Sequence, residues 1–328
     1  MEFPLITAVY AVLIAFAVHI LAERPLIPFL TRMKFGQNVR SDGPQTHLKK
    51  TGTPTMGGIA IIAGLAAASV FFLWRNVDGL VLVLTTVGFG LVGFLDDYLK
   101  VVKKRSLGLR AYQKILGQLI VSAPLIWYAA HSGNMIFGLN ATSLLVPFGR
   151  SVDLGRYYVP FAVFVVIAVV NGSNLTDGLD GLAAGVGVRM LAFFIVMAWA
   201  AGSGTLPIAG AAAGSLLGFL LFNGHPARII MGDTGSLALG GFVAGLAILL
   251  KMPLFIPIVG FIFFIESLSV VLQVGYFKFS GGKRLFKMAP IHHSFELAGW
   301  PETRIVTLFY AVTSVACLVG FLAGRNLI

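Results

Sequence analysis

The chain has little charge and almost no cysteine. Only 11% of its 328 residues are charged, whereas a soluble globular domain carries about 25%. Cys317 is the only cysteine, so no intrachain disulfide can form. The first ten residues, MEFPLITAVY, have no basic region and no cleavage motif, and we therefore expect a retained first span rather than a signal peptide. These absences exclude a soluble enzyme of ordinary composition and a disulfide-stabilised scaffold.

Apolar residues make up 57% of the chain, and the mean hydropathy is +0.90. The apolar runs are about 17–24 residues long and do not alternate with period two, which favours helices over a barrel. We predict an all-α polytopic membrane protein with a single integral membrane domain, residues 1–328. About ten transmembrane helices are expected, over residues 4–23, 56–74, 80–95, 112–130, 158–173, 182–201, 206–222, 236–250, 254–276 and 304–323.

The long links between these spans all fall on one side of the membrane and carry most of the positive charge. Of the 24 lysines and arginines, 18 lie in or beside those links. The positive-inside rule makes that side cytoplasmic, so the net charge of +11 indicates orientation rather than nucleic-acid binding. With an even number of spans, both termini are expected outside. Residues 131–157 form the one sizeable external loop, and a small hairpin is expected there.

The few acids gather at the cytoplasmic ends of the expected spans. The stretch LVGFLDDYLKVVKK, residues 91–104, ends an apolar run with Asp96 and Asp97. Adjacent helical residues point about 100° apart, so one carboxylate can face a metal or reacting group while the other holds a cation such as Lys100. Acids in or near spans are costly and usually functional. A carboxylate pair with a divalent ion is typical of phosphoryl transfer, although a solvated helix end would also show this pattern.

Two further stretches place acids near glycine. In NGSNLTDGLDGLAAG, residues 171–185, Asn174, Asp177 and Asp180 recur every three residues and would line one face if they open a helix. Helix capping explains one of these three residues but not all of them. Asp233 lies in a Gly-Asp-Thr-Gly turn before a span, where backbone amides can hold a phosphate and a carboxylate can hold magnesium. A plain helix cap is the alternative for Asp233.

Two links contain groups suited to an anionic ligand. His292 and His293 are adjacent in KMAPIHHSFELAGWPE, residues 288–303, without the cysteines or the third nearby histidine that a structural zinc site needs. Contact with phosphate or substrate is the better interpretation, and a loop histidine without a role is the alternative. Lys49 and Lys50 precede a turn rich in glycine, threonine and proline that leads into the second span.

Five stretches together carry a family resemblance: HLKKTGTPTMGG, GFLDDYLKV, NLTDGLDGLA, GDTGSLALGG and PIHHSFELAGWPE. In this order they resemble the phospho-N-acetylmuramoyl-pentapeptide transferases, within the polyprenyl-phosphate N-acetylhexosamine-1-phosphate transferase superfamily. The resemblance covers essentially the whole chain. It implies Mg²⁺-dependent transfer of phospho-MurNAc-pentapeptide from UDP-MurNAc-pentapeptide to undecaprenyl phosphate. The products would be UMP and lipid I, for peptidoglycan synthesis and hence cell shape and division, at the cytoplasmic face of the bacterial inner membrane.

The resemblance also implies roles for individual residues. Asp233 would bind Mg²⁺, and Asp96, Asp97, Asp233 and His292 would be catalytic, with Asp97 serving the acceptor phosphate. Substrate would be bound by Lys50, Thr55, Lys100, Lys114, Asn174, Asp177, Asp180, Asn223, Gln273 and His293. The family usually has three consecutive histidines, and this chain has Ser294 in the third position. A hydroxyl cannot take a positive charge, and we expect Ser294→His to be tolerated if this position faces substrate.

Three alternatives stay open at this point. The donor could be UDP-GlcNAc, as in the sister branch of the superfamily. The protein could be a transporter or flippase, although transporters usually place key charges near the bilayer midplane, where only Arg189 and Glu266 are expected. The transfer could also proceed through an aspartate-linked phosphosugar rather than in one displacement. Glycine-rich spans permit a homodimer, and membrane lipids are the expected surroundings.

Overall fold

The computed structural model describes residues 4–33, 52–103, 108–132 and 136–327, and within them the chain is predominantly helical. Eight of these helices are long and apolar enough to cross a membrane, as expected for a polytopic membrane protein. They are α1 (Leu5–Arg32), α3 (Val77–Val101), α5 (Tyr158–Thr176), α6 (Leu182–Ala200), α7 (Leu206–Asn223), α8 (Gly232–Leu249), α10 (Phe261–Phe279) and α12 (Glu302–Ala323).

Two further helices coincide with predicted spans but are shorter or more polar. α2 (Gly58–Ser69) continues into a 3-10 turn, η2 (Val70–Phe72), and is an apolar helix of less than membrane length. α4 (Ala111–His131) carries Gln113, Lys114 and Gln118 in its first half, and these residues lower its hydropathy. The structure therefore supports eight candidate spans directly, and the full set of ten stays a prediction.

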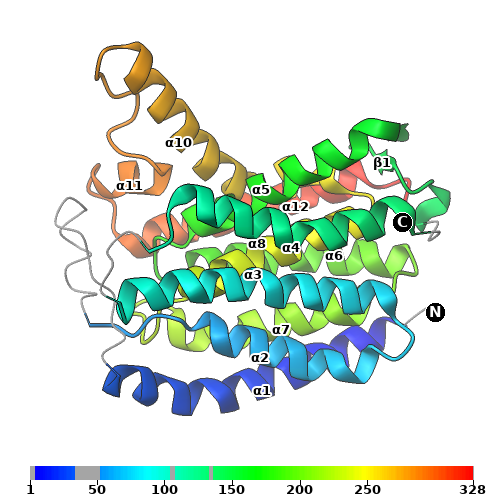
Figure 1. Cartoon of the computed structure of the whole chain (residues 1–328), viewed down its shortest axis with the longest axis horizontal. Coiled ribbons are helices and arrows are strands. Elements are labelled where there is room, and N and C mark those ends of the chain that lie inside the picture. The colour runs from blue at the N-terminus through cyan, green and yellow to red at the C-terminus, as the bar shows by residue number, and fades with distance from the viewer. Residues whose placement is uncertain (1–3, 34–51, 104–107, 133–135, 328) are drawn as a thin grey trace.

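The span predicted over 254–276 overlaps a candidate span, Phe261–Phe279, but the segment is not one continuous helix. The segment consists of a 3-10 turn, η5 (Pro253–Phe255), a single turn of helix, α9 (Ile256–Val259), and then α10. Gly260 separates α9 from α10 with φ −101° and ψ 30°, which are not helical values. Beyond this break, α10 leans away from the other helices and leads to the short helix α11 (Ile291–Glu296) (Figure 1). We call residues 261–297 the arm.

The most buried helix is α8, in which every residue from Thr234 to Leu249 is buried. It packs against α3 and α5 and also contacts α2, α4 and α6. Small residues make this central position feasible, because they let helix backbones approach closely. At Gly93 of α3, an added Cβ would lie 2.1 Å from the carbonyl oxygen of Asp233. The end of α3 and the start of α8 therefore touch backbone to backbone.

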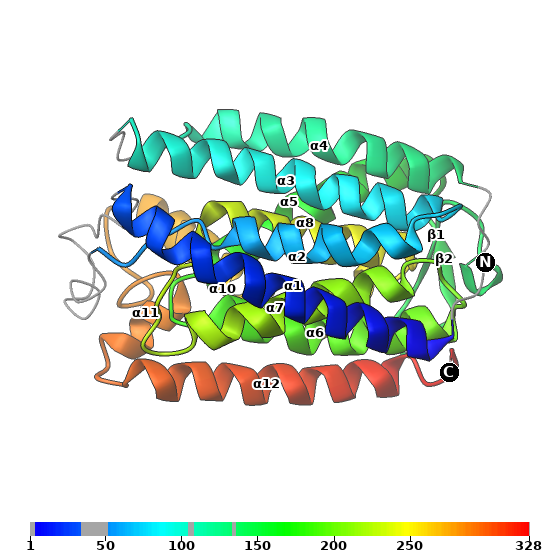
Figure 2. The same ribbon diagram turned by 90° about the horizontal axis from the view of Figure 1, so that it is seen from below.

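The end of the bundle opposite the arm holds the small hairpin expected in residues 131–157. Strands β1 (Ser143–Leu145) and β2 (Ser151–Asp153) pair antiparallel, with Leu144 opposite Val152. Short 3-10 turns flank the hairpin, η3 (Ile136–Gly138) before it and η4 (Gly155–Tyr157) after it. The beginning of α1 and the end of α12 lie at this same end (Figure 2). That arrangement is what an even number of spans requires, and the side of the membrane it faces remains a prediction.

A buried lysine links several elements at the hairpin end of the bundle. Lys251, in the turn after α8, is 2% exposed, and its Nζ donates to the carbonyl oxygens of Ala141 and, at 3.4 Å, Ala129. The ammonium also lies 5.6 Å from the ring centroid of Tyr158. Burial lowers the pKa of Lys251 to about 8, while the charge of Asp78 opposes that shift. This lysine fastens the α8–α9 turn to the hairpin loop and to α4.

Candidate active site

Asp97 at the end of α3 holds the first turn of α8. Its Oδ1 accepts the backbone N–H of Asp233 at 3.1 Å. Its Oδ2 accepts the N–H of Thr234 at 2.9 Å and the hydroxyl of Thr234 at 2.7 Å. Both carboxylate oxygens therefore bind the start of another helix, where unpaired amides and the helix dipole favour an anion. Asp97 thus fixes the position of Asp233.

Asp96 points in a different direction from its neighbour, as expected for adjacent helical residues. Its Oδ1 accepts the N–H of Leu109 at 2.7 Å, just before α4. Its Oδ2 lies 2.5 Å from the Nζ of Lys100 and 3.8 Å from the Nζ of Lys114. The prediction that Lys100 pairs with this carboxylate pair is confirmed for Asp96.

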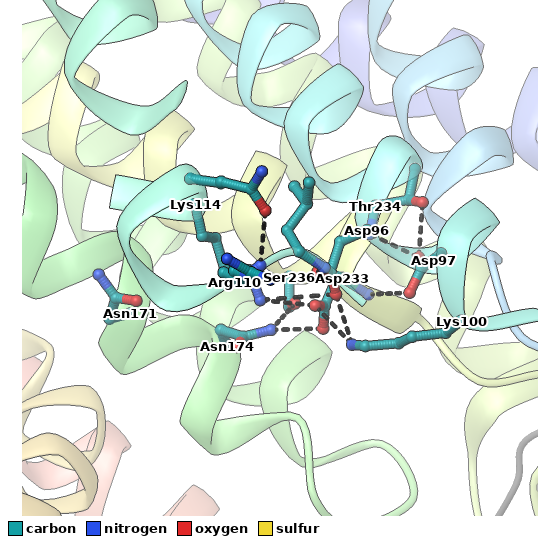
Figure 3. Close-up of polar contacts among 12 residues, drawn as sticks. Asp96, Asp97, Lys100, Arg110, Lys114, Asn171, Asn174, Asp233, Thr234 and Ser236 are labelled. Atoms are coloured by element: carbon teal, nitrogen blue, oxygen red, sulfur yellow. Dashed lines mark hydrogen bonds and ion pairs between the residues drawn. The ribbon is translucent and has the colours of Figure 1, made fainter. Parts of the chain in front are cut away.

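Asp233 lies where four helices meet. Its Oδ2 accepts hydrogen bonds from Lys114 at 2.6 Å and Lys100 at 2.9 Å. Its Oδ1 accepts the side-chain amide of Asn174 at 2.8 Å, and that amide also donates to Ser236. Figure 3 shows these side chains converging from α3, α4, α5 and α8. Residues separated by more than a hundred positions in sequence therefore form one polar cluster, which we call the carboxylate centre.

The carboxylate centre has more negative than positive charge. One oxygen from each of Asp96, Asp97 and Asp233 lies within 4.8 Å of the others, and the two ammonium groups of Lys100 and Lys114 face them. Three carboxylates against two ammoniums leave one negative charge uncompensated when all five are ionised. An all-oxygen donor set of this kind suits a hard divalent cation. The residues therefore fit a divalent metal.

Thr55 borders the carboxylate centre. The segment before α2 pairs with the segment before α8, through Ile230 N–H to Pro54 O at 2.8 Å and Gly57 N–H to Ile230 O at 3.0 Å. A Cβ added at Gly232 would lie 2.8 Å from the Oγ1 of Thr55 and 2.7 Å from the Oδ2 of Asp97. Lys50, the other residue predicted in this link, lies outside the described residues.

The expectation that Asn174, Asp177 and Asp180 line one face of an opening helix is wrong. Asn174 belongs to the last turn of α5, which ends at Thr176, and Asp177 is the residue after it, with φ −77° and ψ 51°. Asp180 lies in the turn before α6, and Gly181 completes that turn with φ +78°. Glycine adopts this left-handed conformation without strain. The chain therefore turns between these polar residues, so that Asn174 and Asp180 have different partners.

Asp180 belongs to a second polar cluster, formed with His225 and Glu302. Its Oδ2 accepts the N–H of Ala227 at 3.0 Å and lies 3.0 Å from the Nδ1 of His225. Glu302, at the start of α12, accepts the N–H of Asp180 at 2.5 Å and lies 3.7 Å from His225. His225 was not predicted from the sequence. Its place in the link between Asn223 and Asp233 was the available signal.

Asn223 and Gln273 each use their side chain to hold a link. The Oδ1 of Asn223 accepts the N–H of Gly181 at 2.9 Å, and its Nδ2 donates to Ile229 O at 2.9 Å. The Oε1 of Gln273, on α10, accepts the N–H of Phe286 at 2.8 Å. Asn223 therefore joins the α5–α6 turn to the α7–α8 link, whereas Gln273 acts within the arm.

The two adjacent histidines have different partners. His292 is fully buried, with its Nδ1 3.1 Å from the Oε2 of Glu266 on α10. His293 is more accessible, with its Nδ1 2.7 Å from the Oε2 of Glu296 in the same short helix. The two imidazole ring centroids are 4.1 Å apart.

Ser294 is engaged by the backbone of its own link. Its hydroxyl donates to Met288 O at 2.5 Å and accepts Met288 N–H at 3.1 Å. Both hydrogen bonds between Ser294 and Met288 would be lost in Ser294→His, because an imidazole cannot make them in the same space. The structure therefore speaks against the expectation that this substitution is tolerated.

The predicted site residues thus fall into three groups. Asp96, Asp97, Lys100, Lys114, Asn174 and Asp233 meet at the carboxylate centre, with Thr55 beside it. Asp180 and Asn223 anchor the adjoining links, and Asp177 lies between these two groups along the chain. Gln273, His292 and His293 belong to the arm. The roles of all these residues toward a substrate stay predictions.

Comparisons with known proteins agree on one family. The model of glycosyl transferase family 4 matches residues 79–251, and the phospho-N-acetylmuramoyl-pentapeptide-transferase signature 1 matches residues 50–62. The chain is 49% identical to the phospho-N-acetylmuramoyl-pentapeptide-transferase of Caldanaerobacter subterraneus, over 95% of this chain and 97% of the relative. It is 48% identical to that of Acetivibrio thermocellus, over 97% and 95%. Identity to that of Clostridioides difficile is 47%, over 96% and 97%. The chain belongs to the phospho-N-acetylmuramoyl-pentapeptide transferases.

Proposed function

We propose that the protein transfers phospho-MurNAc-pentapeptide from UDP-MurNAc-pentapeptide to undecaprenyl phosphate, which yields lipid I and UMP for peptidoglycan synthesis. The observation that carries this proposal is the carboxylate centre, at one end of a bundle of membrane-length helices. A lipid phosphate and a soluble sugar nucleotide can meet only at such an end. We place that end at the cytoplasmic face of the bacterial inner membrane, crossed by ten helices with both termini outside, because positive charge accumulates in its links.

The proposed reaction is one displacement. An oxygen of the lipid phosphate attacks the donor phosphorus that bears the sugar. The bond from that phosphorus to the bridging oxygen breaks, and UMP leaves with the oxygen. The second pKa of a phosphate monoester is about 6. The acceptor phosphate has therefore largely lost its second proton at neutral pH and needs no strong base. The remaining obstacle is repulsion between two anions, which Lys100 and Lys114 counter.

We further propose that the divalent cation is Mg²⁺, held by Asp233 with Asp96 beside it. When bound, the ion supplies positive charge to phosphoryl oxygens. Lys100 and Lys114 would then turn from Asp233 toward the phosphates, while Asp97 keeps the start of α8 in place. That Asp97 acts on the acceptor phosphate stays a prediction.

The nucleotide would lie toward the α5–α6 and α7–α8 links, near Asn174, Asp177, Asp180 and Asn223, with Lys50 and Thr55 on the α2 side. Gln273, His292 and His293 would contact the phosphosugar from the arm. We assign the phosphates to the carboxylate centre, the nucleoside to the links and the sugar to the arm, and the three separate groups of residues support this assignment.

The test is UMP release by the purified protein with undecaprenyl phosphate and each candidate donor. We expect turnover of UDP-MurNAc-pentapeptide and none of UDP-GlcNAc, and the reverse would replace the proposed donor. Donor alone should release no stoichiometric UMP, because a single displacement needs the acceptor. A burst of UMP without acceptor would establish the aspartate-linked route. Flux of lipid across vesicles without UMP release would indicate a flippase.

Metal binding needs a readout that does not depend on turnover. We expect added Mg²⁺ to raise the melting temperature of the detergent-solubilised wild type, because a ligand that binds only the native state stabilises it. Asp233→Asn should show no such rise. An equal rise in both proteins would remove Asp233 as the metal ligand.

A further inference from the structure

Glu266 is a buried carboxylate within α10, and the carboxylate centre does not use it. Its residue exposure is 0%, as is that of His292, and 3.1 Å separates Glu266 Oε2 from His292 Nδ1. The two residues come from different elements, α10 and α11. A buried carboxylate on a membrane-length helix is costly and usually marks a functional site. Glu266 contacts His292, which is expected to meet substrate.

The other nitrogen of His292 lies against the α5–α6 turn. Among the described residues, the buried Nε2 has no hydrogen-bond partner. A Cβ added at Gly178 would lie 2.2 Å from this Nε2. Gly178 follows the end of α5, the helix whose last turn carries Asn174 to Asp233. The unpartnered nitrogen therefore lies at the same helix end that contributes to the carboxylate centre.

We propose that Glu266 is a positioning residue for phosphosugar transfer. It keeps Nδ1 of His292 protonated and turned into the bundle, so that Nε2 faces a phosphoryl oxygen of the donor. This inference rests on the proposed function, in which His292 contacts substrate. A hydrogen bond at one ring nitrogen determines the tautomer and the direction of the other.

The chemistry at Nε2 follows from the carboxylate. An acidic partner at one imidazole nitrogen favours a proton on the other nitrogen when an anion lies beside it. Nε2 then presents an N–H to an anionic oxygen, which suits a diphosphate.

The contact of His293 with Glu296 differs from that of His292 with Glu266, because it lies within one short helix. His293 contacts Glu296, three residues away in the same six-residue helix, and that contact cannot orient α11 relative to the rest of the molecule. Glu266 joins α11 to α10 and also determines the ring's direction.

The decisive variant is Glu266→Gln, which keeps the shape and removes the charge. We expect kcat to fall about 10- to 100-fold, by analogy with the loss found when the hydrogen-bond partner of a metal-bound histidine is changed, with KM for undecaprenyl phosphate unchanged. Ser267→Ala is the matched control, because the buried Ser267 hydroxyl on the same helix turn has no partner among the described residues. Its kcat should stay at the wild-type value.

A double-mutant cycle separates positioning from structural damage. Glu266→Gln should cause no further loss of kcat in a His292→Ala background, because two residues that act as a unit are not additive. Additive losses would overturn the proposal. Normal kcat in Glu266→Gln beside an inactive His292→Ala would overturn it too and leave the proposed function intact. Normal kcat in His292→Ala would instead remove His292 from the proposed function.

Gly178→Ala provides a second route if Glu266→Gln does not fold. Gly178 does not have a positive φ, so alanine is compatible with its backbone, and the added methyl group would displace the His292 ring. We expect this variant to lose kcat about as much as Glu266→Gln, with a lower melting temperature, because the methyl group overpacks the space beside the buried His292 ring. Wild-type kcat in Gly178→Ala would contradict the placement of Nε2 and with it the proposal.

Discussion

The two ends of the helix bundle bury charge in opposite ways. At the hairpin end, Lys251 is 2% exposed and its ammonium is bound by backbone carbonyls and a tyrosine ring. At the other end, Asp233 and Lys100 form an ion pair with side chains that remain 14% and 36% exposed. The first arrangement is closed, and its donors are taken up by the fold. The second is charged, partly open and short of one positive charge.

This difference separates charge that supports the fold from charge that can serve a ligand. A buried ammonium whose partners are backbone carbonyls and a tyrosine ring of its own fold has nothing to offer a substrate. A cluster of acids and lysines that neutralise each other incompletely can exchange those partners for a metal ion and phosphates. The comparison predicts that substitutions at the carboxylate centre affect turnover, whereas substitutions at the hairpin end affect only stability.

The largest effect is expected for Asp233→Asn. Loss of the carboxylate removes the proposed metal ligand and leaves Lys100 and Lys114 without their shared acceptor charge, so kcat should fall at least about 10²–10³-fold. Because asparagine has nearly the same shape, the melting temperature should change little. UMP release and thermal unfolding measure the two quantities. Asp78→Asn, at the hairpin end, is the matched control and should keep wild-type turnover.

Asp97→Asn should reduce both turnover and stability. The variant keeps one side-chain oxygen for the amides of Asp233 and Thr234 but loses the negative charge at the N-terminus of α8, a change worth about 0.3–2 kcal/mol. We therefore expect a lower melting temperature than for Asp233→Asn, together with a lower kcat. Equal melting temperatures for the two variants would mean that Asp97 does not hold α8.

A smaller effect is expected for Ser294→His. The hydroxyl that closes the loop with Met288 is lost, which costs about 0.5–1.5 kcal/mol for each hydrogen bond, and the bulkier ring must leave the loop. The melting temperature should fall by a few degrees, and Ser294→Ala, which lacks only the hydroxyl, should show part of that fall. Unchanged stability in Ser294→His would support the sequence-based expectation of a substrate-facing position.

The smallest effect concerns pH at the hairpin end. The pKa of Lys251 is about 8 in the fold and about 10.4 in an unfolded chain, so between these values the unfolded state binds more protons. Stability contributed by this group therefore rises with pH across that window. Between pH 7 and pH 10, the melting temperature of the wild type should rise relative to that of Lys251→Met, while kcat of the variant stays normal. A constant difference would contradict the lowered pKa.

Sequence alone predicted the features that depend on local composition. Apolar runs located the helices, and acids next to apolar runs marked the helix ends that carry Asp96, Asp97 and Asp233. The contact of Lys100 with Asp96 also followed, because it depends only on helical spacing.

The remaining features depend on backbone geometry and on distant partners. The turn after Thr176 sent Asn174 and Asp180 to different clusters, although their spacing suited one helix face. The break at Gly260 interrupts an apolar run, and Pro257 and Gly260 were the available signals for it. The pairing of Glu266 with His292 joins two links of the chain across a buried interface, which no periodicity encodes.

The joint between Asp97 and the first amides of α8 has a mechanical consequence. These hydrogen bonds join α3 to α8, and the two backbones touch at Gly93. Movement of one helix along the other would therefore break the contacts of Asp233 with Lys100 and Lys114. If the protein closes over a bulky sugar peptide, we therefore expect the movement in the arm, which begins where the helix is interrupted at Gly260.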